Sequence, residues 1–142
     1  MLPAHLSALA RTIYGEARGE STDGKIAVGH VILNRLYQAK KNQSRAKQFG
    51  TNVEEVCFKK WQFSCWNPND PNSEIILNVT EANDMFKICI EIADKVLGGA
   101  TSDLTIGATH YHVASMGFPK AWGEKKEPCA KIGNHWFYNN IA

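Results

Sequence analysis

One segment is apolar on nearly every side when it is placed on a helix: STDGKIAVGHVILNRLYQAKK, residues 21–41. A helix on a protein surface keeps a polar face, so a helix without one has to be surrounded by other elements. The pattern therefore predicts a central helix, capped by one of residues 21–23. A polar stripe runs along it, because His30, Asn34 and Tyr37 follow one another at helical spacing.

Two further helices are predicted to pack around this central one. The first runs from about Pro3 to Ala17 and ends at Gly19, and the second covers roughly residues 81–97 with a clear apolar face. Between them we expect three shorter segments. They are KKNQSRAKQFG as a loop, TNVEEVCFKK as a short capped helix, and QFSCWNPNDPNS as irregular, turn-rich chain.

The last third of the chain changes character. Residues 104–115 and 131–140 show alternation and aromatic enrichment, which predicts short strands. Helices first and a small β element last define an α+β protein. A chain of 142 residues is long enough to bury a core, so we expect one domain spanning residues 1–142.

Composition excludes several classes of function. A net charge of +2 is too weak to indicate a nucleic-acid partner, and no apolar run is long enough for membrane insertion. The N-terminus lacks the features of a signal peptide, so we expect synthesis in the cytoplasm. We also expect a monomer. Four cysteines match no metal-binding spacing and are interpreted as buried or idle thiols, with a Cys57–Cys65 bridge as the lesser alternative: Cys57, Cys65, Cys89 and Cys129.

Glu16 stands at the end of the first predicted helix, where the helix dipole disfavours negative charge. On a helical projection it falls beside Leu9, at the edge of the apolar face, so we expect it to be half-buried. Burial and the helix end both favour the protonated carboxylic acid, which is the form that a general acid needs. The alternative is a salt bridge with Arg18 or Arg35, and position alone does not decide between the two.

Glu20 is a second carboxylate in the same motif. In a continuous helix it would be the neighbour of Glu16, as a glycosidase with two carboxylates requires. Gly19 makes such continuity unfavourable. We therefore expect Glu20 to cap the following helix or to pair with an arginine.

A pair of histidines stands in the first predicted strand. His110 and His112 are two residues apart and so share one face, and His135 or a glutamate would complete a zinc site with them. With Tyr111 between them, the same residues fit a sugar-binding wall. We favour the hydrogen-bonding role, and expect neither a metal nor a cofactor.

Aromatic side chains concentrate outside the long helices: Phe49, Trp61, Phe63, Trp66, Tyr111, Trp122, Trp136, Phe137 and Tyr138. Tryptophans on loops can stack on sugar rings, while neighbouring amides bind hydroxyl and acetamido groups. Core packing is the preferred interpretation for Phe63, Phe137 and Tyr138. For Trp66 and Trp122, sugar binding and core packing are equally supported.

Six segments, in this order, carry a resemblance to a known family: YGEARGES, VGHVILNR, QFSCW, GATHYH, PKAW and IGNHWFY. They resemble the SleB/CwlJ-type cell wall hydrolases, whose founding members are spore-cortex-lytic enzymes, and the resemblance spans residues 12–138. The resemblance implies a lysozyme-like α+β fold, related to lytic transglycosylases. It also implies cleavage of peptidoglycan glycan strands between N-acetylmuramic acid and N-acetylglucosamine. The acid/base of the family is the first glutamate of YGEARGE, which here is Glu16.

The resemblance implies a lytic transglycosylase or muramidase that acts on the cell wall after release or export. In a lytic transglycosylase the C6 hydroxyl of muramic acid attacks the anomeric carbon, so one carboxylate can serve both proton transfers. Two alternatives remain, a glycan-binding module without turnover and a zinc amidase that uses His110 and His112. Eight residues are expected to bind substrate beside Glu16: Asn34, Gln62, Ser64, Trp66, His110, Tyr111, Trp122 and His135.

Overall fold

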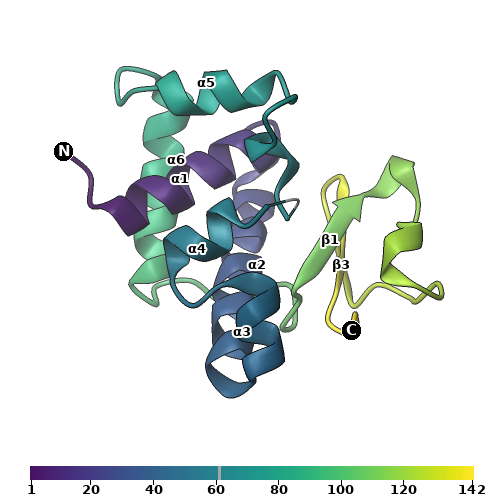
Figure 1. Cartoon of the computed structure of the whole chain (residues 1–142). Helices are drawn as coiled ribbons and strands as arrows, with labels where there is room; N and C mark the ends of the chain where they lie inside the picture. The colour runs from purple at the N-terminus through teal and green to yellow at the C-terminus, as the bar shows by residue number, and fades with distance from the viewer. Residues whose placement is uncertain (61) are drawn as a thin grey trace.

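The computed structural model describes residues 1–60 and 62–142, so Trp61 lies outside the described residues. The chain forms six α-helices and a three-stranded sheet within this part (Figure 1). The helices are α1 Ala4–Ala17, α2 Thr22–Lys41, α3 Gln43–Phe49, α4 Val53–Phe58, α5 Asn72–Asn78 and α6 Asp84–Leu97. The strands are β1 His110–Val113, β2 Ala130–Ile132 and β3 His135–Tyr138, and the 3₁₀ turns are η1 Ser64–Trp66, η2 Ala114–Met116 and η3 Lys120–Trp122.

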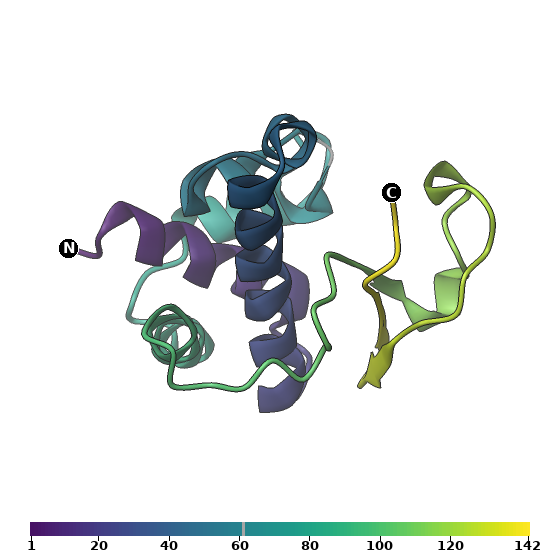
Figure 2. The ribbon, with the colours of Figure 1, turned by 90° about the horizontal axis from the view of Figure 1, so that it is seen from below.

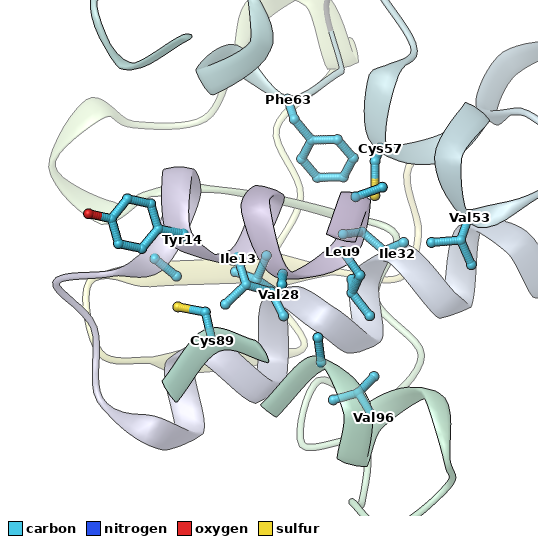
Figure 3. Close-up of a cluster of buried hydrophobic side chains, with 14 of the residues drawn as sticks. Leu9, Ile13, Tyr14, Val28, Ile32, Val53, Cys57, Phe63, Cys89 and Val96 are labelled. Carbon is cyan, nitrogen blue, oxygen red and sulfur yellow. The ribbon is translucent and has the colours of Figure 1, made fainter. Parts of the chain in front are cut away.

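Helix α2 is the central element, as its apolar surroundings predicted. Ser21 caps it by accepting a hydrogen bond from the backbone N–H of Gly24. Its residues Val28 and Ile32 are fully buried in the helical core, and Figure 3 shows Val28 beside Ile13 of α1. Figure 2 shows α6 on one side of α2 and the sheet on the other.

The sheet has the strand order β1-β3-β2, and both pairings are antiparallel. Tyr111 lies opposite Phe137, and Val113 lies opposite His135, so these four side chains share one face. Phe137 is fully buried on this face in a small second core with Ala27 and Val31 of α2. This core seats the sheet on the central helix, and it turns the face that carries Tyr111 toward the helices.

Two helices were not anticipated. The segment KKNQSRAKQFG was expected to be a loop, yet it contains α3. The Asn42 side chain accepts hydrogen bonds from the N–H groups of Ser44 and Arg45 and so caps α3, while Phe49 is fully buried at its far end. Helix α5 was missed as well, and its single buried residue, Ile76, carries too little pattern to predict a helix.

The other boundaries follow the predictions closely. Helix α6 begins at Asp84 rather than near residue 81, because Asn83 caps it by accepting from the N–H of Phe86.

Among the described residues, no helix is both long enough and apolar enough to cross a membrane. All four cysteines are free thiols, so a bridge between Cys57 and Cys65 is not formed. Burial raises the pKa of Cys57 to about 12, which keeps this thiol protonated and unreactive.

Candidate active site

The carboxylate of Glu16 lies half-buried in the last turn of α1, and both of its oxygens accept hydrogen bonds. The phenolic hydroxyl of Tyr111 donates to Oε1 over 2.5 Å, and the backbone N–H of Cys65 donates to Oε2 over 3.1 Å. These donors come from β1 and η1. Three elements that are distant in sequence therefore hold one side chain in a fixed orientation.

The alternative that Glu16 forms a salt bridge is wrong. In the part of the chain that the structure describes, no ion pair within 4.0 Å joins it to Arg18 or Arg35. Arg18 instead donates to the side-chain oxygen of Asn72 over 2.6 Å and to the carbonyl of Tyr14 over 3.1 Å. The carboxylate is consequently left facing the cavity described below.

Arg35 places a buried, immobilised positive charge near this carboxylate. Its Nε donates to the carbonyl of Thr109 over 2.7 Å, and its Nη1 donates to the side-chain oxygen of Gln62 over 2.8 Å. The guanidinium also lies over the rings of Phe49 and Phe63, at 5.0 and 4.7 Å from their centroids. Burial lowers the pKa of Arg35 to about 10, so the group remains charged near neutral pH.

Gly15, the residue before the acid, permits a close approach between α1 and η1. A Cβ at this position would lie 2.8 Å from both Cβ and Sγ of Cys65, closer than real contacts allow. Only glycine therefore lets the Cys65 backbone come near enough to donate to Glu16. This explains in steric terms why the motif places a glycine directly before the glutamate.

Tyr111 is held as a hydrogen-bond donor by its surroundings. Its ring packs edge-on against His135 at a centroid distance of 4.9 Å, and at a tilt of 38° against Phe137 at 5.5 Å. Burial, and then the charge of Glu16, raise the pKa of Tyr111 well above its ordinary value. The phenol consequently keeps its proton and directs it at the carboxylate.

A cavity of about 580 Å³ opens beside Glu16. Six of the eight residues expected to bind substrate line it together with the glutamate: Gln62, Ser64, His110, Tyr111, Trp122 and His135. Glu16 also lines a second cavity, of about 490 Å³. Both cavities are lined by Glu16, Val113 and His135, so the two hollows meet at the carboxylate. Such an arrangement suits a chain-like ligand that passes across Glu16.

The structure does not bring Asn34 and Trp66 into either cavity, which corrects their predicted role. The Asn34 amide donates to the Asp103 carboxylate and to the carbonyl of Ala108, both over 2.9 Å, and so ties α2 to the segment before β1. The indole N–H of Trp66 donates to Thr12 over 2.9 Å, and its ring packs against the helical core. Sequence spacing could not show that both side chains are already used inside the fold.

Glu20 neither caps a helix nor pairs with an arginine, because Ser21 is the cap of α2. Its carboxylate instead accepts hydrogen bonds from the backbone N–H and the side-chain amide of Asn134, over 2.9 and 3.0 Å. Burial alone would raise the pKa of Glu20, but these two hydrogen bonds outweigh it and the pKa is lowered. Glu20 is therefore an ionised carboxylate that holds the turn between β2 and β3.

The histidines do not assemble as a zinc site. His110 and His112 share one face of β1, as predicted, but His135 lies opposite Val113 and so belongs to the other face. Both ring nitrogens of His112 are engaged, Nδ1 with the carbonyl of Val113 and Nε2 with the hydroxyl of Tyr138, each at 2.8 Å. Within residues 1–60 and 62–142, no group of three or more potential ligands is placed to hold a metal ion.

The contact between the backbone N–H of Cys65 and Glu16 was not predicted from the sequence. A main-chain donor has no residue signature, since every residue except proline carries one. The only available hint was Gly15, whose missing side chain marks a place where two segments come close.

Comparison with known proteins places this geometry in context. The sequence matches the Cell Wall Hydrolase family over residues 19–138, a segment that begins just after Glu16. Two curated proteins named spore cortex-lytic enzyme, from Oceanobacillus iheyensis and Bacillus subtilis, are 36% and 32% identical to it over 83 residues. These matches cover 54% of this chain but only 27% and 25% of the relatives, so the chain corresponds to about a quarter of their length.

Two solved structures share the fold. The catalytic domain of the Bacillus cereus SleB protein superposes with a TM-score of 0.69 at 26% identity, covering 94% of this chain and 88% of that one. The catalytic domain of the germination-specific lytic transglycosylase SleB from Bacillus anthracis gives a TM-score of 0.70 at 24% identity, covering 96% and 99%. The prediction of a lysozyme-like, mainly helical fold with a small sheet near the C-terminus is confirmed.

Proposed function

The chain belongs to the cell wall hydrolase family, and from this premise we propose that it cuts peptidoglycan glycan strands between N-acetylmuramic acid and N-acetylglucosamine. One observation carries the proposal: a half-buried glutamate stands where two cavities meet, with both of its oxygens oriented by hydrogen bonds. A glycan strand passing through both cavities would present one glycosidic bond to Glu16.

In this reaction Glu16 acts as the general acid. Its protonated carboxyl group delivers a proton to the glycosidic oxygen while the bond from that oxygen to the anomeric carbon breaks, through a transition state with oxocarbenium character. The carboxylate that remains is stabilised by the two donors already in place, Tyr111 and the Cys65 N–H. Hydrogen bonds to an ionised acceptor are stronger than those to a neutral one, so both contacts tighten as the proton leaves.

We further propose a one-carboxylate mechanism of the lytic transglycosylase or muramidase type. Glu20 is the other carboxylate that lines the second cavity, and Asn134 already occupies both of its oxygens. This supports attack on the anomeric carbon by a hydroxyl group, from C6 of muramic acid or from water, rather than by a second carboxylate.

The site is built from both parts of the fold. Glu16 comes from α1, whereas Tyr111 comes from the sheet, so neither part would contain the site alone. We therefore propose that residues 1–142 act as one catalytic domain and as a monomer. Its partner is the peptidoglycan of the cell wall, which it reaches after release or export.

Mass spectrometry of digested peptidoglycan tests the proposal. We expect new muramic acid ends, in the 1,6-anhydro form for a transglycosylase or in the reducing form for a muramidase. Release of stem peptides by cleavage at the lactyl amide would identify an amidase and contradict the proposal. Binding to peptidoglycan with no soluble product would indicate a binding module and would contradict it as well.

A further inference from the structure

His135, the first residue of β3, occupies an unusual position in the proposed site. It is only 5% exposed, yet it lines both cavities together with Glu16. Its ring stands edge-on to Tyr111, whose hydroxyl holds the Glu16 carboxylate. His135 therefore lies beside the place where the proposed reaction would occur, although the acid step does not use it.

The two nitrogens of the His135 ring have different surroundings. Nδ1 is buried and has no hydrogen-bond partner among the described residues, and it lies 3.8 Å from Oε1 of Glu20. A buried polar atom without a partner is costly, and a short movement of the ring would pair it with this carboxylate. Hydrogen bonds between catalytic groups are often long before substrate binds and shorten in the complex.

Glu20 is well suited to orient this ring, because its own carboxylate is fixed. Asn134 donates to both of its oxygens, and the Lys25 ammonium donates to its backbone carbonyl. A Cβ on Gly133 would collide with Oε1, so this glycine makes room for the carboxylate beneath the turn. The carboxylate is thus held in place next to the His135 ring by contacts that do not involve His135 itself.

The state of the ring follows from these contacts. Burial lowers the pKa of His135, although the nearby charges of Glu20 and Glu16 act in the opposite direction. The ring is therefore neutral near pH 7, and the proton of a neutral imidazole belongs on the nitrogen that faces the carboxylate. The lone pair then belongs to Nε2, on a ring that lines both cavities.

We propose that His135, oriented by Glu20, is the base that accepts the proton of the attacking hydroxyl group in the reaction proposed above. The hydroxyl oxygen forms a bond to the anomeric carbon and gives its proton to Nε2. The bond from the anomeric carbon to the glycosidic oxygen breaks, and that oxygen keeps the electron pair and takes its proton from Glu16. The imidazolium so formed pairs with Glu20. His135 then loses a proton to solvent and Glu16 regains one, so the proton count is unchanged.

This assignment divides the proton transfers between two side chains. The family resemblance gives both transfers to Glu16 in sequence, whereas here Glu16 supplies the proton of the leaving oxygen and His135, held by Glu20, takes the proton of the attacking hydroxyl. A carboxylate that orients a histidine in this way also fixes its tautomer and stabilises its charged form.

The test uses the full chain and purified peptidoglycan under single-turnover conditions. We expect His135→Ala to lower the rate of glycan cleavage by at least about 10²-fold, the low end for loss of a positioned base. Binding to insoluble peptidoglycan should persist, and free imidazole should restore the rate at least about tenfold by occupying the vacated space. Rescue by imidazole separates a base from a residue that only supports the fold. His5→Ala, an exposed histidine on α1, is the matched control and should cleave at the wild-type rate.

Two further variants keep the test decisive. His135→Gln preserves much of the ring volume but cannot accept the proton, so it should be as slow as His135→Ala even if the alanine variant folds poorly. Glu20→Gln should slow cleavage by about tenfold, because the orienting charge is lost while His135 remains. A folded His135→Ala or His135→Gln variant that cleaves within about threefold of wild type would overturn the proposal. So would a folded, substrate-binding His135→Ala that imidazole does not restore.

The same experiments separate this inference from the proposed function. If wild-type protein creates no new glycan ends, or if Glu16→Gln remains fully active, the proposed function is wrong. If wild type is active and Glu16→Gln is inactive while the His135 variants cleave normally, only the role of His135 is wrong.

Discussion

The hydroxyl of Tyr111 and the carboxylate of Glu16 are 95 residues apart in sequence and 2.5 Å apart in the structure. This hydrogen bond joins the sheet to the last turn of α1. It means that the position of the proposed acid depends on how the sheet docks against the helices, through the small core around Phe137.

Replacing Tyr111 with phenylalanine should therefore reduce turnover and leave the fold intact. The ring keeps its packing, but Oε1 of Glu16 loses its donor, and we expect kcat to fall by about 10- to 100-fold, or about 1.4–2.8 kcal/mol. Substrate affinity should hardly change. Tyr14→Phe is the control, because the Tyr14 hydroxyl makes only a 3.4 Å contact with Asn83 and is not among the lining residues of either cavity. Equal effects in kinetic assays of both variants would contradict the role given to Tyr111.

Glu16→Gln should abolish most of the activity. Glutamine can still accept from the Cys65 N–H and donate to the Tyr111 oxygen, but it cannot protonate the glycosidic oxygen. We expect a loss of at least about 10²-fold in cleavage rate, with binding to peptidoglycan retained. Glu91→Gln, an exposed glutamate on α6, is the matched control and should behave as wild type in the same turbidity assay. Full activity of Glu16→Gln would show that the acid lies elsewhere.

The two tryptophans predicted to bind sugars should respond in opposite ways. Trp122 lines the larger cavity, so Trp122→Ala should weaken substrate binding by about 1–3 kcal/mol, by analogy with aromatic stacking on nucleic-acid bases. Trp66 packs edge-on against Phe58 and bonds to Thr12, so Trp66→Ala should lower the free energy of unfolding by about 2–3 kcal/mol. Binding isotherms and urea titrations on both variants distinguish the two effects. If Trp66→Ala binds substrate more weakly while its free energy of unfolding is unchanged, Trp66 is a sugar-binding residue after all.

Chelation should not affect activity. His112 uses both ring nitrogens in hydrogen bonds, and His135 points from the opposite face of the sheet. General acid catalysis by a carboxyl group requires no ion, so we expect lysis to stay within about twofold of its rate when EDTA is added. Loss of activity that zinc restores would instead support the amidase alternative.

Stability should fall as the solution becomes acidic. Burial, with help from the positive charges of Arg35 and Arg45, lowers the pKa of His110 from 6.5 to about 3. The unfolded chain therefore binds a proton at this histidine more readily than the folded one. The free energy of unfolding is therefore unaffected by this histidine above about pH 6.5 and falls progressively toward pH 3, and the loss reaches about 2 kcal/mol at pH 5.

Urea unfolding at several pH values measures this effect. His110→Asn should flatten the dependence between pH 7 and pH 5 relative to wild type. His30 and His135 have lowered pKa values as well, chiefly through burial, so some loss of stability at low pH should persist in the variant. An unchanged slope in His110→Asn would show that His110 is not the group responsible.

The long elements could be predicted from sequence because their patterns are strong. The apolar surroundings of α2 and the buried stripe of α6 reflect burial along many residues, and alternation marked the strands. Helices α3 and α5 were missed because each is seven residues long with one fully or nearly fully buried residue, Phe49 or Ile76. Too few turns are present for a periodic signal to appear.

The candidate site was only partly predictable for a different reason. Residue types and the family resemblance pointed to Glu16 and to much of the cavity wall. Partners that depend on how segments meet in space could not be read in this way. Asn34 and Trp66 had the right chemistry, but Asp103 and Thr12 engage them inside the fold. Glu20 was expected to cap a helix or to pair with an arginine, and its actual partner, Asn134, could not be foreseen because it lies 114 residues further along the chain.

The meeting of two cavities at Glu16 also has a mechanical consequence. A glycan strand in a cross-linked wall is tethered along its length, so it offers few free ends to thread through a closed tunnel. Both cavities are open to solvent and not enclosed, so a strand that binds there need not be threaded from a free end. For the proposed reaction, each cut would then fall within a strand under tension. The cross-linked wall would then lose tensile strength after a small number of cuts, well before much soluble sugar is released.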